Sequence, residues 1–298
     1  MTIDSGGATS ASAGERAATE RLRIARAAQP GYERPFRTRT VDVGGVRFGG
    51  DEVVVVAGPC AVESRAQTLT IARACRSAGV RMLRGGAYKP RTSPYSFQGL
   101  GRAGLEILAE ARAETGLPFV TEVLDPRLVE LVASYADMLQ IGSRNMQNFP
   151  LLAEVGRARK PVLLKRGFGT TVEEWLCSAE HILHAGNTEI VFCERGLRSF
   201  DGGPRPRTAL DLAGLRRLRE LAPFPVLVDP SHVAGSFERV PELAAAGLDA
   251  GAHGLLIEVI ADGTDRDTVL CDGPHAIEIG VLRRIVERAA APVREIRV

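Results

Sequence analysis

Short apolar runs alternate with helical patterns from residue 53 onward, and this alternation predicts the fold. Each run has only four to six residues, a length typical of a buried strand rather than a helix. Eight such βα units predict an α/β protein with a closed (β/α)8 TIM barrel, and a doubly wound open sheet is the alternative. The candidate strands are Val53–Ala57, Arg81–Arg84, Phe119–Val123, Met138–Ile141, Val162–Lys165, Glu189–Cys193, Val226–Asp229 and Gly254–Val259.

The sequence also marks the ends of several intervening helices. Ser64–Gln67 and Thr171–Glu174 are capping-box sequences, which start helices. Asp125-Pro126 offers an N-cap followed by proline at the first helical position, whereas Gly79 and Gly116 are suited to end helices. One further helix is predicted from an apolar stripe formed by Leu212, Leu215, Leu218 and Leu221.

The first 50 residues do not follow this alternation and form a predicted N-terminal extension. Met1 to Gly14 is rich in Gly, Ala, Ser and Thr and is expected to be disordered. Glu15 to Ala28 could form a short basic helix, and Thr40 to Phe48 predicts a β-hairpin of the kind that closes the bottom of a barrel. The predicted domains are therefore an extension over 1–50 and a catalytic barrel over 51–298.

Composition and charge narrow the class of protein. The chain has 45% hydrophobic and 25% charged residues, as expected of a soluble globular protein. Its net charge of +2 predicts neither nucleic-acid binding nor attraction to membranes. No apolar stretch approaches the roughly 20 residues that span a bilayer, and the N-terminus does not resemble a signal peptide. Five scattered cysteines argue against a disulfide framework, so a cytoplasmic protein is expected.

A reactive side chain lies at the carboxyl end of every candidate strand or just after it. In a (β/α)8 barrel all eight carboxyl ends of the strands meet on one face, where active sites form. Two or three such residues could simply be solvated surface charges. That explanation does not account well for an ionisable or thiol group at all eight strand ends. In chain order these positions carry Cys60, Arg84, Glu122, Arg144, Lys165, Arg195, His232 and Glu258.

Four of the rim residues are candidate metal ligands, namely Cys60, His232, Glu258 and Asp272. Sulfur, nitrogen and carboxylate oxygen together suit Mn, Fe, Co or Zn better than Mg or Ca. Taken singly each is weak evidence, because a cysteine after a strand is usually packing and Asp272 could cap the helix that follows it. Barrel closure, which brings the first and last strands side by side, favours a shared site.

Other cysteines and histidines are assigned structural positions. Three cysteines fall within predicted helices or a strand and are assigned to the core: Cys75, Cys177 and Cys193. His181 and His184 share one helix with no acidic third ligand, so they are interpreted as structural or surface residues. His253 precedes the last strand and is expected at the opposite end of the barrel.

Six cations are predicted on the same rim, where they would repel each other without anionic ligands: Arg84, Lys89, Arg91, Arg144, Lys165 and Arg195. Arginine suits bidentate binding of phosphate or carboxylate, and lysine acts as a point charge. We therefore predict two phosphorylated substrates beside a metal, although a solvated basic loop at residues 89–93 is the simpler alternative. No strand-to-helix GxGxxG or Walker pattern occurs, which argues against dinucleotide and ATP chemistry.

Longer motifs from about residue 53 to the C-terminus resemble 3-deoxy-D-arabino-heptulosonate 7-phosphate (DAHP) synthases of the type I-beta family. The most telling run is residues 83–101, which begins Leu-Arg-Gly-Gly-Ala-Tyr-Lys-Pro-Arg-Thr-Ser-Pro. Further matches are Val55–Ser64, Ile141–Asn145, Leu163–Gly167, Cys193–Gly196 and Asp229–His232.

The resemblance implies a role for each matched residue. Family metal ligands match Cys60, His232, Glu258 and Asp272, and the implied cofactor is one divalent ion, Mn, Co, Fe or Zn. Phosphoenolpyruvate contacts match Arg84, Lys89, Ser143, Arg144, Lys165 and Arg195. Erythrose 4-phosphate would be held by the loop that carries Arg91, Thr92 and Ser93. Lys89 and Glu122, with Cys60 and His232, are the implied catalytic residues.

The implied reaction is the metal-dependent condensation of these two substrates in the shikimate pathway, or in a secondary-metabolic branch of it. The sequence departs from the family pattern at four places, which bear on the substrate details and the pathway: Ile260-Ala261, Arg207–Asp211, Val233–Gly235 and the loop 261–270. The alternatives are a 3-deoxy-manno-octulosonate 8-phosphate synthase and a non-catalytic regulatory paralogue. Relatives form homodimers or homotetramers, and those inhibited by aromatic amino acids usually carry an extra regulatory domain. Only about 50 residues precede the first strand here, so weak direct feedback inhibition is expected.

Overall fold

Eight parallel strands close into a barrel in the computed structural model, which describes residues 38–199 and 207–290. Each strand pairs in parallel with the next along the chain, and β12 pairs with both β11 and β3 to close the ring. The predicted (β/α)8 barrel is therefore confirmed. The barrel strands are β3 (Val54–Gly58), β4 (Met82–Arg84), β5 (Phe119–Glu122), β6 (Met138–Ile141), β7 (Val162–Lys165), β8 (Ile190–Glu194), β11 (Val226–Val228) and β12 (Gly254–Ile260). Every predicted strand lies within one residue of these bounds at either end.

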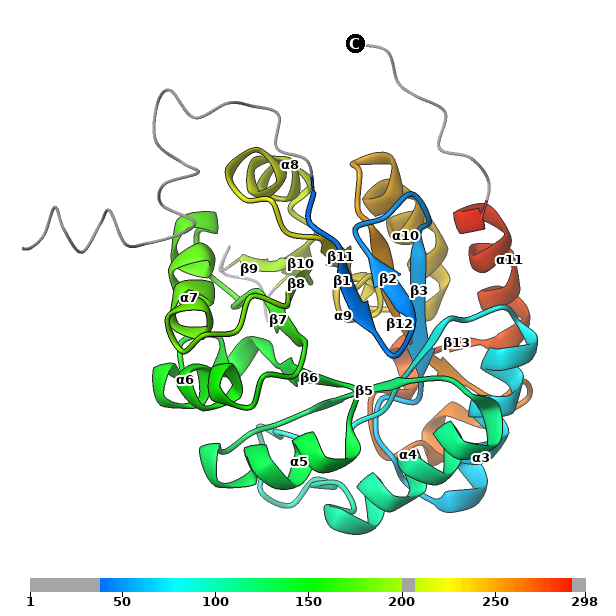
Figure 1. Ribbon diagram of the computed structural model, residues 1–298. Helices are drawn as coiled ribbons and strands as arrows, with labels where there is room; N and C mark the ends of the chain where they lie inside the picture. The colour runs from blue at the N-terminus through cyan, green and yellow to red at the C-terminus, as the bar shows by residue number, and fades with distance from the viewer. Residues whose placement is uncertain (1–37, 200–206, 291–298) are drawn as a thin grey trace, which may run out of the picture.

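Helices cover the outside of this ring of strands (Figure 1). They are α3 (Arg65–Ser77), α4 (Arg102–Thr115), α5 (Val129–Tyr135), α6 (Phe149–Arg157), α7 (Val172–His184), α8 (Leu212–Leu221), α10 (Val240–Asp249) and α11 (Ile279–Ala290). The short helix α9 (Ser231–Ala234) lies instead at the mouth of the barrel. The Thr171 side chain accepts from the backbone N–H of Glu174, and the Glu174 side chain accepts from that of Thr171, which is the predicted capping box. Gly116 ends α4 in the left-handed conformation that glycine adopts without strain.

A β-hairpin fills the amino-terminal end of the barrel, as predicted. Strands β1 (Val41–Val43) and β2 (Val46–Phe48) pair across Gly44 and Gly45, whose positive φ angles of 58° and 84° suit a tight hairpin turn. The Val41, Val43, Val46 and Phe48 side chains belong to the same buried cluster as the inward-facing residues of the barrel strands. Burial of these side chains explains why the hairpin lies across this opening (Figure 1).

A second hairpin interrupts the βα pattern after β8. Strands β9 (Leu197–Ser199) and β10 (Arg207–Ala209) pair antiparallel at the carboxyl end of the barrel. They were not predicted, because residues 195–211 contain no clear apolar alternation. A two-residue strand β13 (Ile277–Glu278) also pairs with β12. The β9–β10 hairpin brings additional side chains to the mouth of the barrel.

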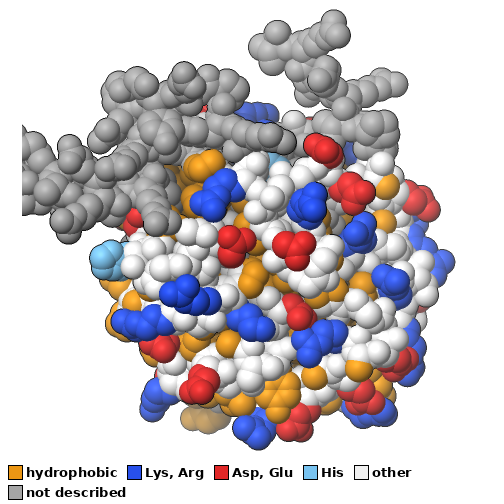
Figure 2. Space-filling view, in the orientation of Figure 1, with side chains coloured by type: hydrophobic (Ala, Val, Ile, Leu, Met, Phe, Trp, Pro, Cys, Tyr) orange, Lys and Arg blue, Asp and Glu red, His pale blue; other side chains and the backbone are white. Residues whose placement is uncertain are grey.

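Three predictions about the N-terminal region stay predictions. The disordered segment 1–14 and the helix 15–28 lie outside the described residues, and the domain boundary at residue 50 has no independent support. On the face shown in Figure 2, basic and acidic side chains are interspersed where the described residues are visible. Within the described part of the chain, no helix has the length and apolar character needed to cross a membrane.

Candidate active site

A cavity of about 880 Å³ opens at the carboxyl ends of the barrel strands. Loops after six strands and the carboxyl end of β5 contribute to its wall, as the sequence predicted for a barrel active site. All six predicted cations line it, together with Thr92, Ser93, Glu122 and Ser143 from the other predicted positions. His232 and Asp272 also reach the cavity, whereas Cys60 and Glu258 are buried beneath it.

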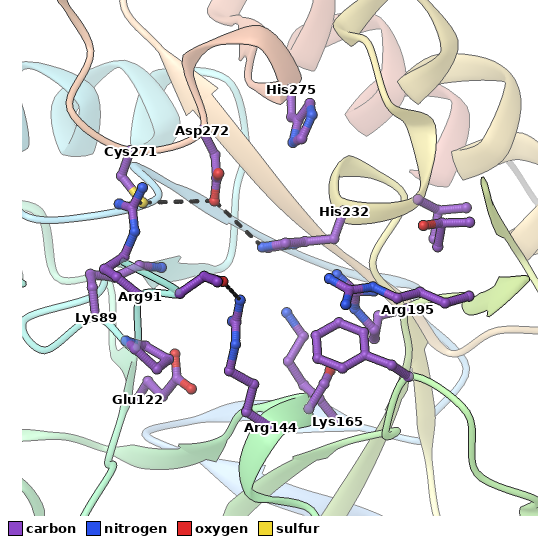
Figure 3. Close-up of a pocket in the computed structure, with 18 of the residues that line it drawn as sticks. Lys89, Arg91, Glu122, Arg144, Lys165, Arg195, His232, Cys271, Asp272 and His275 are labelled. Atoms are coloured by element: carbon purple, nitrogen blue, oxygen red, sulfur yellow. Dashed lines mark hydrogen bonds and ion pairs between the residues drawn. The ribbon is translucent and has the colours of Figure 1, made fainter. Parts of the chain in front are cut away.

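The four predicted metal ligands lie next to one another. Glu258 Oε1 is 3.4 Å from His232 Nε2, and the same histidine nitrogen is 3.9 Å from Asp272 Oδ2. Asp272 Oδ2 is in turn 3.1 Å from the sulfur of Cys60, which follows β3 on the other side of the closure. Asp272 therefore joins the two halves of the cluster, with its side chain directed between Cys271 and His232 (Figure 3).

An unpartnered oxygen supports the fit of a cation to this cluster. Glu258 is only 1% exposed, and its Oε2 atom has no hydrogen-bond partner, although burying such a carboxylate oxygen is costly. Its other oxygen accepts from Arg84 Nη1 at 2.7 Å. An ion bound between Glu258, His232, Asp272 and Cys60 would satisfy the vacant oxygen with a donor set that suits a divalent transition metal.

Asp229 holds His232 in place from below the cluster. The Asp229 carboxylate accepts from the backbone N–H of His232 at 3.1 Å and lies 2.7 Å from its ring Nδ1, and it also forms an ion pair with Lys165. Burial would raise the pKa of Asp229, but the charges and hydrogen bonds of His232 and Lys165 hold it well below its usual value. With Nδ1 donating to this carboxylate, Nε2 is free to bind a metal.

Lys89 lines the pocket beside Arg91 and is only 7% exposed (Figure 3). Its Nζ donates to the Cys60 carbonyl and contacts the Cys60 sulfur, each at 3.2 Å. Burial would lower the pKa of Lys89, but the thiols of Cys60 and Cys271 raise it, so the ammonium form is favoured. Gly86 makes this position possible, because a Cβ there would lie 2.9 Å from the Cys60 carbonyl oxygen and would also crowd the Lys89 stem.

Arginines gather around Phe168 on the opposite wall. The guanidinium carbons of Arg144, Arg195 and Arg198 lie 5.6, 4.7 and 4.0 Å from the ring centroid, within the range of cation–π contact. Burial lowers the pKa of Arg195, which Asp229 partly offsets. The Arg144 Nη2 group donates to Thr92 Oγ1 at 3.3 Å, and this hydrogen bond joins the arginine side of the cavity to the loop 89–93 (Figure 3). These cations can receive anionic groups entering from the mouth.

Glu122 depends on the glycine beside it. The Glu122 side chain is 6% exposed, and a Cβ on Gly142 would collide with its carboxylate oxygen. We expect Gly142→Ala to displace this carboxylate and to lower kcat by at least tenfold while the circular dichroism spectrum is unchanged. Gly116→Ala is the control for adding a methyl group without a collision, because a Cβ there meets no atom within 4 Å. The positive φ of Gly116 means that this control will lose some stability. Unchanged kcat in Gly142→Ala would show that the position of Glu122 does not matter.

Several pocket residues were missed by the sequence analysis. Arg198 and Thr208 come from the unpredicted β9–β10 hairpin, and Phe168 lies in a loop without a strong pattern. Asp229 was recognised as part of a motif but not as the partner of His232. The three-residue spacing between Asp229 and His232 was the signal that could have shown this pairing. Cys271, to which the sequence analysis assigned no role, is buried against Cys60.

One structural assignment was wrong and others are confirmed. Cys177 is exposed on α7, because it lies on the solvent side of that helix, whereas Cys75 and Cys193 are buried as predicted. His181 and His184 are exposed. His253 is at the amino-terminal end, where its Nδ1 accepts from the backbone N–H of Val226 at 3.1 Å, and burial lowers its pKa to about 4.

Comparisons with known proteins identify the family of this chain. Residues 26–291 match the DAHP synthetase I family. A phospho-2-dehydro-3-deoxyheptonate aldolase of Thermotoga maritima is 45% identical over 247 residues, which cover 83% of this chain and 72% of that protein. A 2-dehydro-3-deoxyphosphooctonate aldolase of Syntrophotalea carbinolica is 31% identical over 271 residues, covering 85% and 95% of the two chains.

Solved structures give the same result. The crystal structure of a Thermotoga maritima DAHP synthase aligns with a TM-score of 0.79 at 43% identity, covering 85% of this chain and 72% of that one. A truncated form of the DAHP synthase from the same organism aligns with a TM-score of 0.76 at 40% identity, covering 85% and 90%. The chain is thus a (β/α)8-barrel enzyme of the aldolase type. The chain belongs to the DAHP synthetase I family.

Proposed function

We propose that the pocket at the carboxyl face of the barrel binds phosphoenolpyruvate and erythrose 4-phosphate side by side. The protein is a 3-deoxy-7-phosphoheptulonate synthase, a transferase whose reaction belongs to aromatic biosynthesis. The observation that carries the assignment of the pocket is that six cations line one cavity, which His232 and Asp272 of the ligand cluster also reach. Two anionic substrates would neutralise those cations, and a metal would occupy the cluster.

Phosphoenolpyruvate is assigned to the side of the pocket near Phe168. Arg144, Lys165 and Arg195 face the cavity there and can bind its phosphate and carboxylate. Arg84 continues this cationic wall toward the metal cluster, and its buried Nε atom has no partner and is available to an anion. The backbone near Ser143 completes this subsite. Holding the substrate by several cations at once would fix its orientation for reaction.

Erythrose 4-phosphate is assigned to the loop of residues 90–93 at the mouth. Arg91 and the hydroxyl groups of Thr92 and Ser93 line the cavity and can bind its phosphate. The aldehyde end would then point toward Lys89 and the ligand cluster. This arrangement places the reacting carbons of the two substrates between the two cationic walls.

Cys60, His232, Glu258 and Asp272 are proposed to hold one divalent ion, for which Mn, Co, Fe and Zn are the candidates. Such an ion supplies Lewis acidity, which polarises the aldehyde oxygen of erythrose 4-phosphate. The remaining contributions come from the chain itself. Asp229 orients His232, and Arg84 holds one oxygen of Glu258 so that the other faces the cluster.

The condensation joins C3 of phosphoenolpyruvate to the aldehyde carbon of erythrose 4-phosphate. A water molecule adds to C2, and collapse of the resulting hemiketal phosphate releases inorganic phosphate, so one water is consumed for each DAHP formed. Lys89, protonated and buried between the substrates, is placed to stabilise charge on the aldehyde oxygen. Glu122 lines the same cavity, where its carboxylate can orient the water.

The cellular setting is proposed from the same features. All five cysteines are free, which supports a reducing cytoplasm. Interspersed surface charges and the small net charge give no basis for nucleic-acid or membrane partners. We propose a homodimer or homotetramer, which sedimentation would test, working in the shikimate pathway or in a secondary-metabolic branch of it.

Two alternatives make different predictions about turnover. A 3-deoxy-manno-octulosonate 8-phosphate synthase would prefer arabinose 5-phosphate, and the Lys89–Ser93 loop favours erythrose 4-phosphate instead. A non-catalytic paralogue would release no phosphate with either sugar, but all four ligand-type residues are present and adjacent. The test is phosphate release with each aldose and phosphoenolpyruvate. Preference for arabinose 5-phosphate, or no release with either sugar in metal-loaded protein, would contradict the proposal.

Arg91→Ala should separate the two subsites. We expect it to raise the KM for erythrose 4-phosphate about ten- to a hundred-fold, because a charge-assisted contact contributes roughly 1.5–3 kcal/mol. The KM for phosphoenolpyruvate should change much less. Steady-state kinetics with each substrate varied in turn measure both constants, and Arg102→Ala, on the exposed first turn of α4, is a control for loss of a surface arginine. Equal losses for both substrates would show that the loop is wrongly assigned.

A further inference from the structure

The thiol of Cys271 lies against the ligand cluster in addition to that of Cys60. Cys271 precedes Asp272, and its sulfur is 3.0 Å from the sulfur of Cys60 and 3.7 Å from Asp272 Oδ2. The side-chain donors of Cys60, Cys271 and Asp272 all lie within 4.8 Å of one another. Asp272 therefore belongs to two possible ligand groups, one with His232 and Glu258 and one with the two thiols.

The backbone fixes this thiol toward the cluster. Glu63 Oε1 accepts from the backbone N–H groups of Leu270 and Cys271 at 3.1 and 3.2 Å, which ties the last barrel loop to the segment that carries Cys60. Asp272 has a φ of 57°, a left-handed conformation that is uncommon for a residue other than glycine. Such backbone conformations persist where the surroundings enforce them, and here one holds adjacent donors toward the same point.

The charges around the two sulfurs suit thiolates. Lys89 Nζ is 3.2 Å from the Cys60 sulfur, and Arg91 Nη1 is 2.9 Å from the Cys271 sulfur. The simpler interpretation is that Cys271 is a small apolar residue packed against Ala61 and Phe97. Packing alone does not explain why a guanidinium, an ammonium and a carboxylate converge on the same pair of thiols, since charged groups gain nothing from an apolar neighbour.

We propose that Cys271 is a second sulfur ligand of the metal ion, with Cys60, Cys271 and Asp272 forming one side of the site and His232 and Glu258 the other. This inference rests on the metal site of the proposed function. Two sulfurs bonded to one five-coordinate ion, each at about 2.3 Å and with a bond angle of about 90–120°, are roughly 3.3–4.0 Å apart, so the pair needs to separate by no more than about an ångström. Each thiol releases its proton as it bonds the ion.

The consequence is a preference for a thiophilic metal. Thiolate ligands favour Zn2+ and Co2+ over Mn2+, whereas carboxylate and imidazole ligands discriminate less sharply. A site with two sulfurs should therefore bind Zn2+ more tightly relative to Mn2+ than the same site with one. Cys271 would then be the residue that sets the metal preference of this chain.

The test uses Co2+-loaded and Zn2+-loaded full-length protein, kept reduced, with Cys60→Ser, Cys271→Ser and the matched control Cys177→Ser. Cys177 is exposed on α7 and away from the pocket, so its removal tests the loss of a thiol alone. We expect Cys271→Ser and Cys60→Ser each to lose about half of the sulfur-to-cobalt charge-transfer absorption per bound metal. We also expect Cys271→Ser to lower the Zn2+ affinity relative to Mn2+ by at least about tenfold. The control should match the wild type.

Counting sulfur neighbours of zinc in the wild-type protein by X-ray absorption makes the result independent of how the variants fold. Two sulfurs per zinc support the inference, and one sulfur overturns it. If Cys60→Ser abolishes the band while Cys271→Ser leaves the band and the Zn2+ affinity unchanged, Cys271 is not a ligand, but the proposed metal site stands. If the wild type has neither charge-transfer absorption nor tight metal binding, the metal site of the proposed function fails as well.

Discussion

Removal of divalent metal should lower turnover by about a thousand-fold or more, and Mn2+ or Co2+ should restore it. The physical reason is that a Lewis acid at the carbonyl contributes several kcal/mol to stabilising the transition state, and each 1.4 kcal/mol is a factor of ten in rate. The measurement is phosphate release with both substrates after chelation, dialysis and addition of defined metals. Cys60→Ala should weaken metal binding, and with it turnover, while the barrel stays folded.

Binding of the metal should also depend on pH. Burial, followed by the hydrogen bond with Cys271, raises the pKa of Cys60, so the free protein carries a neutral thiol there at neutral pH. A metal binds the thiolate and displaces that proton, and the apparent affinity should therefore rise as pH rises.

Full activity in protein shown by elemental analysis to be free of metal would contradict the metal-dependent mechanism.

Asp229→Asn should lower metal affinity about 10- to 100-fold although Asp229 is not a proposed ligand. A carboxylate behind a histidine fixes the ring and strengthens it as a ligand, and losses of this size follow when such a group is removed. The change also leaves the buried Lys165 without its partner, so unfolding free energy should fall by about 3–5 kcal/mol. Chelator competition measures the first effect, and urea denaturation measures the second.

The control for Asp229→Asn is an exposed acid–base pair of the same type. Asp249 pairs with Arg288 on the surface at 3.5 Å, and Asp249→Asn should change the unfolding free energy by no more than about 0.5 kcal/mol. Its metal affinity should equal that of the wild type. Unchanged metal affinity in Asp229→Asn would mean that His232 does not need this carboxylate for its orientation.

Strand periodicity explains which predicted rim residues face the pocket. Successive side chains point to opposite faces of a strand, so Lys165 faces the barrel interior while Arg166 turns outward, to Glu194 at 3.0 Å and Asp211 at 2.8 Å. Glu194 alternates in the same way with Arg195, which lines the pocket. These directions follow from sequence position alone once the strands are known.

The sequence by itself determined the eight strands, their order and the face on which Cys60, His232 and Glu258 gather. It did so because apolar runs mark the strands, and a closed barrel carries every carboxyl end to one rim. It also supplied Asp272, in the loop after the last strand, and the pocket cations, at the strand ends and in the loop 89–93.

Only the tertiary structure decided how the last barrel loop meets the first. Cys271 and Cys60 are separated by 211 positions along the chain, and no periodicity links a loop residue to a partner at that distance. Their contact depends on barrel closure through β12 and β3 and on the Glu63 carboxylate that holds the loop. The same holds for Arg198, which reaches the mouth on a hairpin whose strands have no apolar alternation. Such contacts arise from packing between distant segments, which a local pattern of residues does not encode.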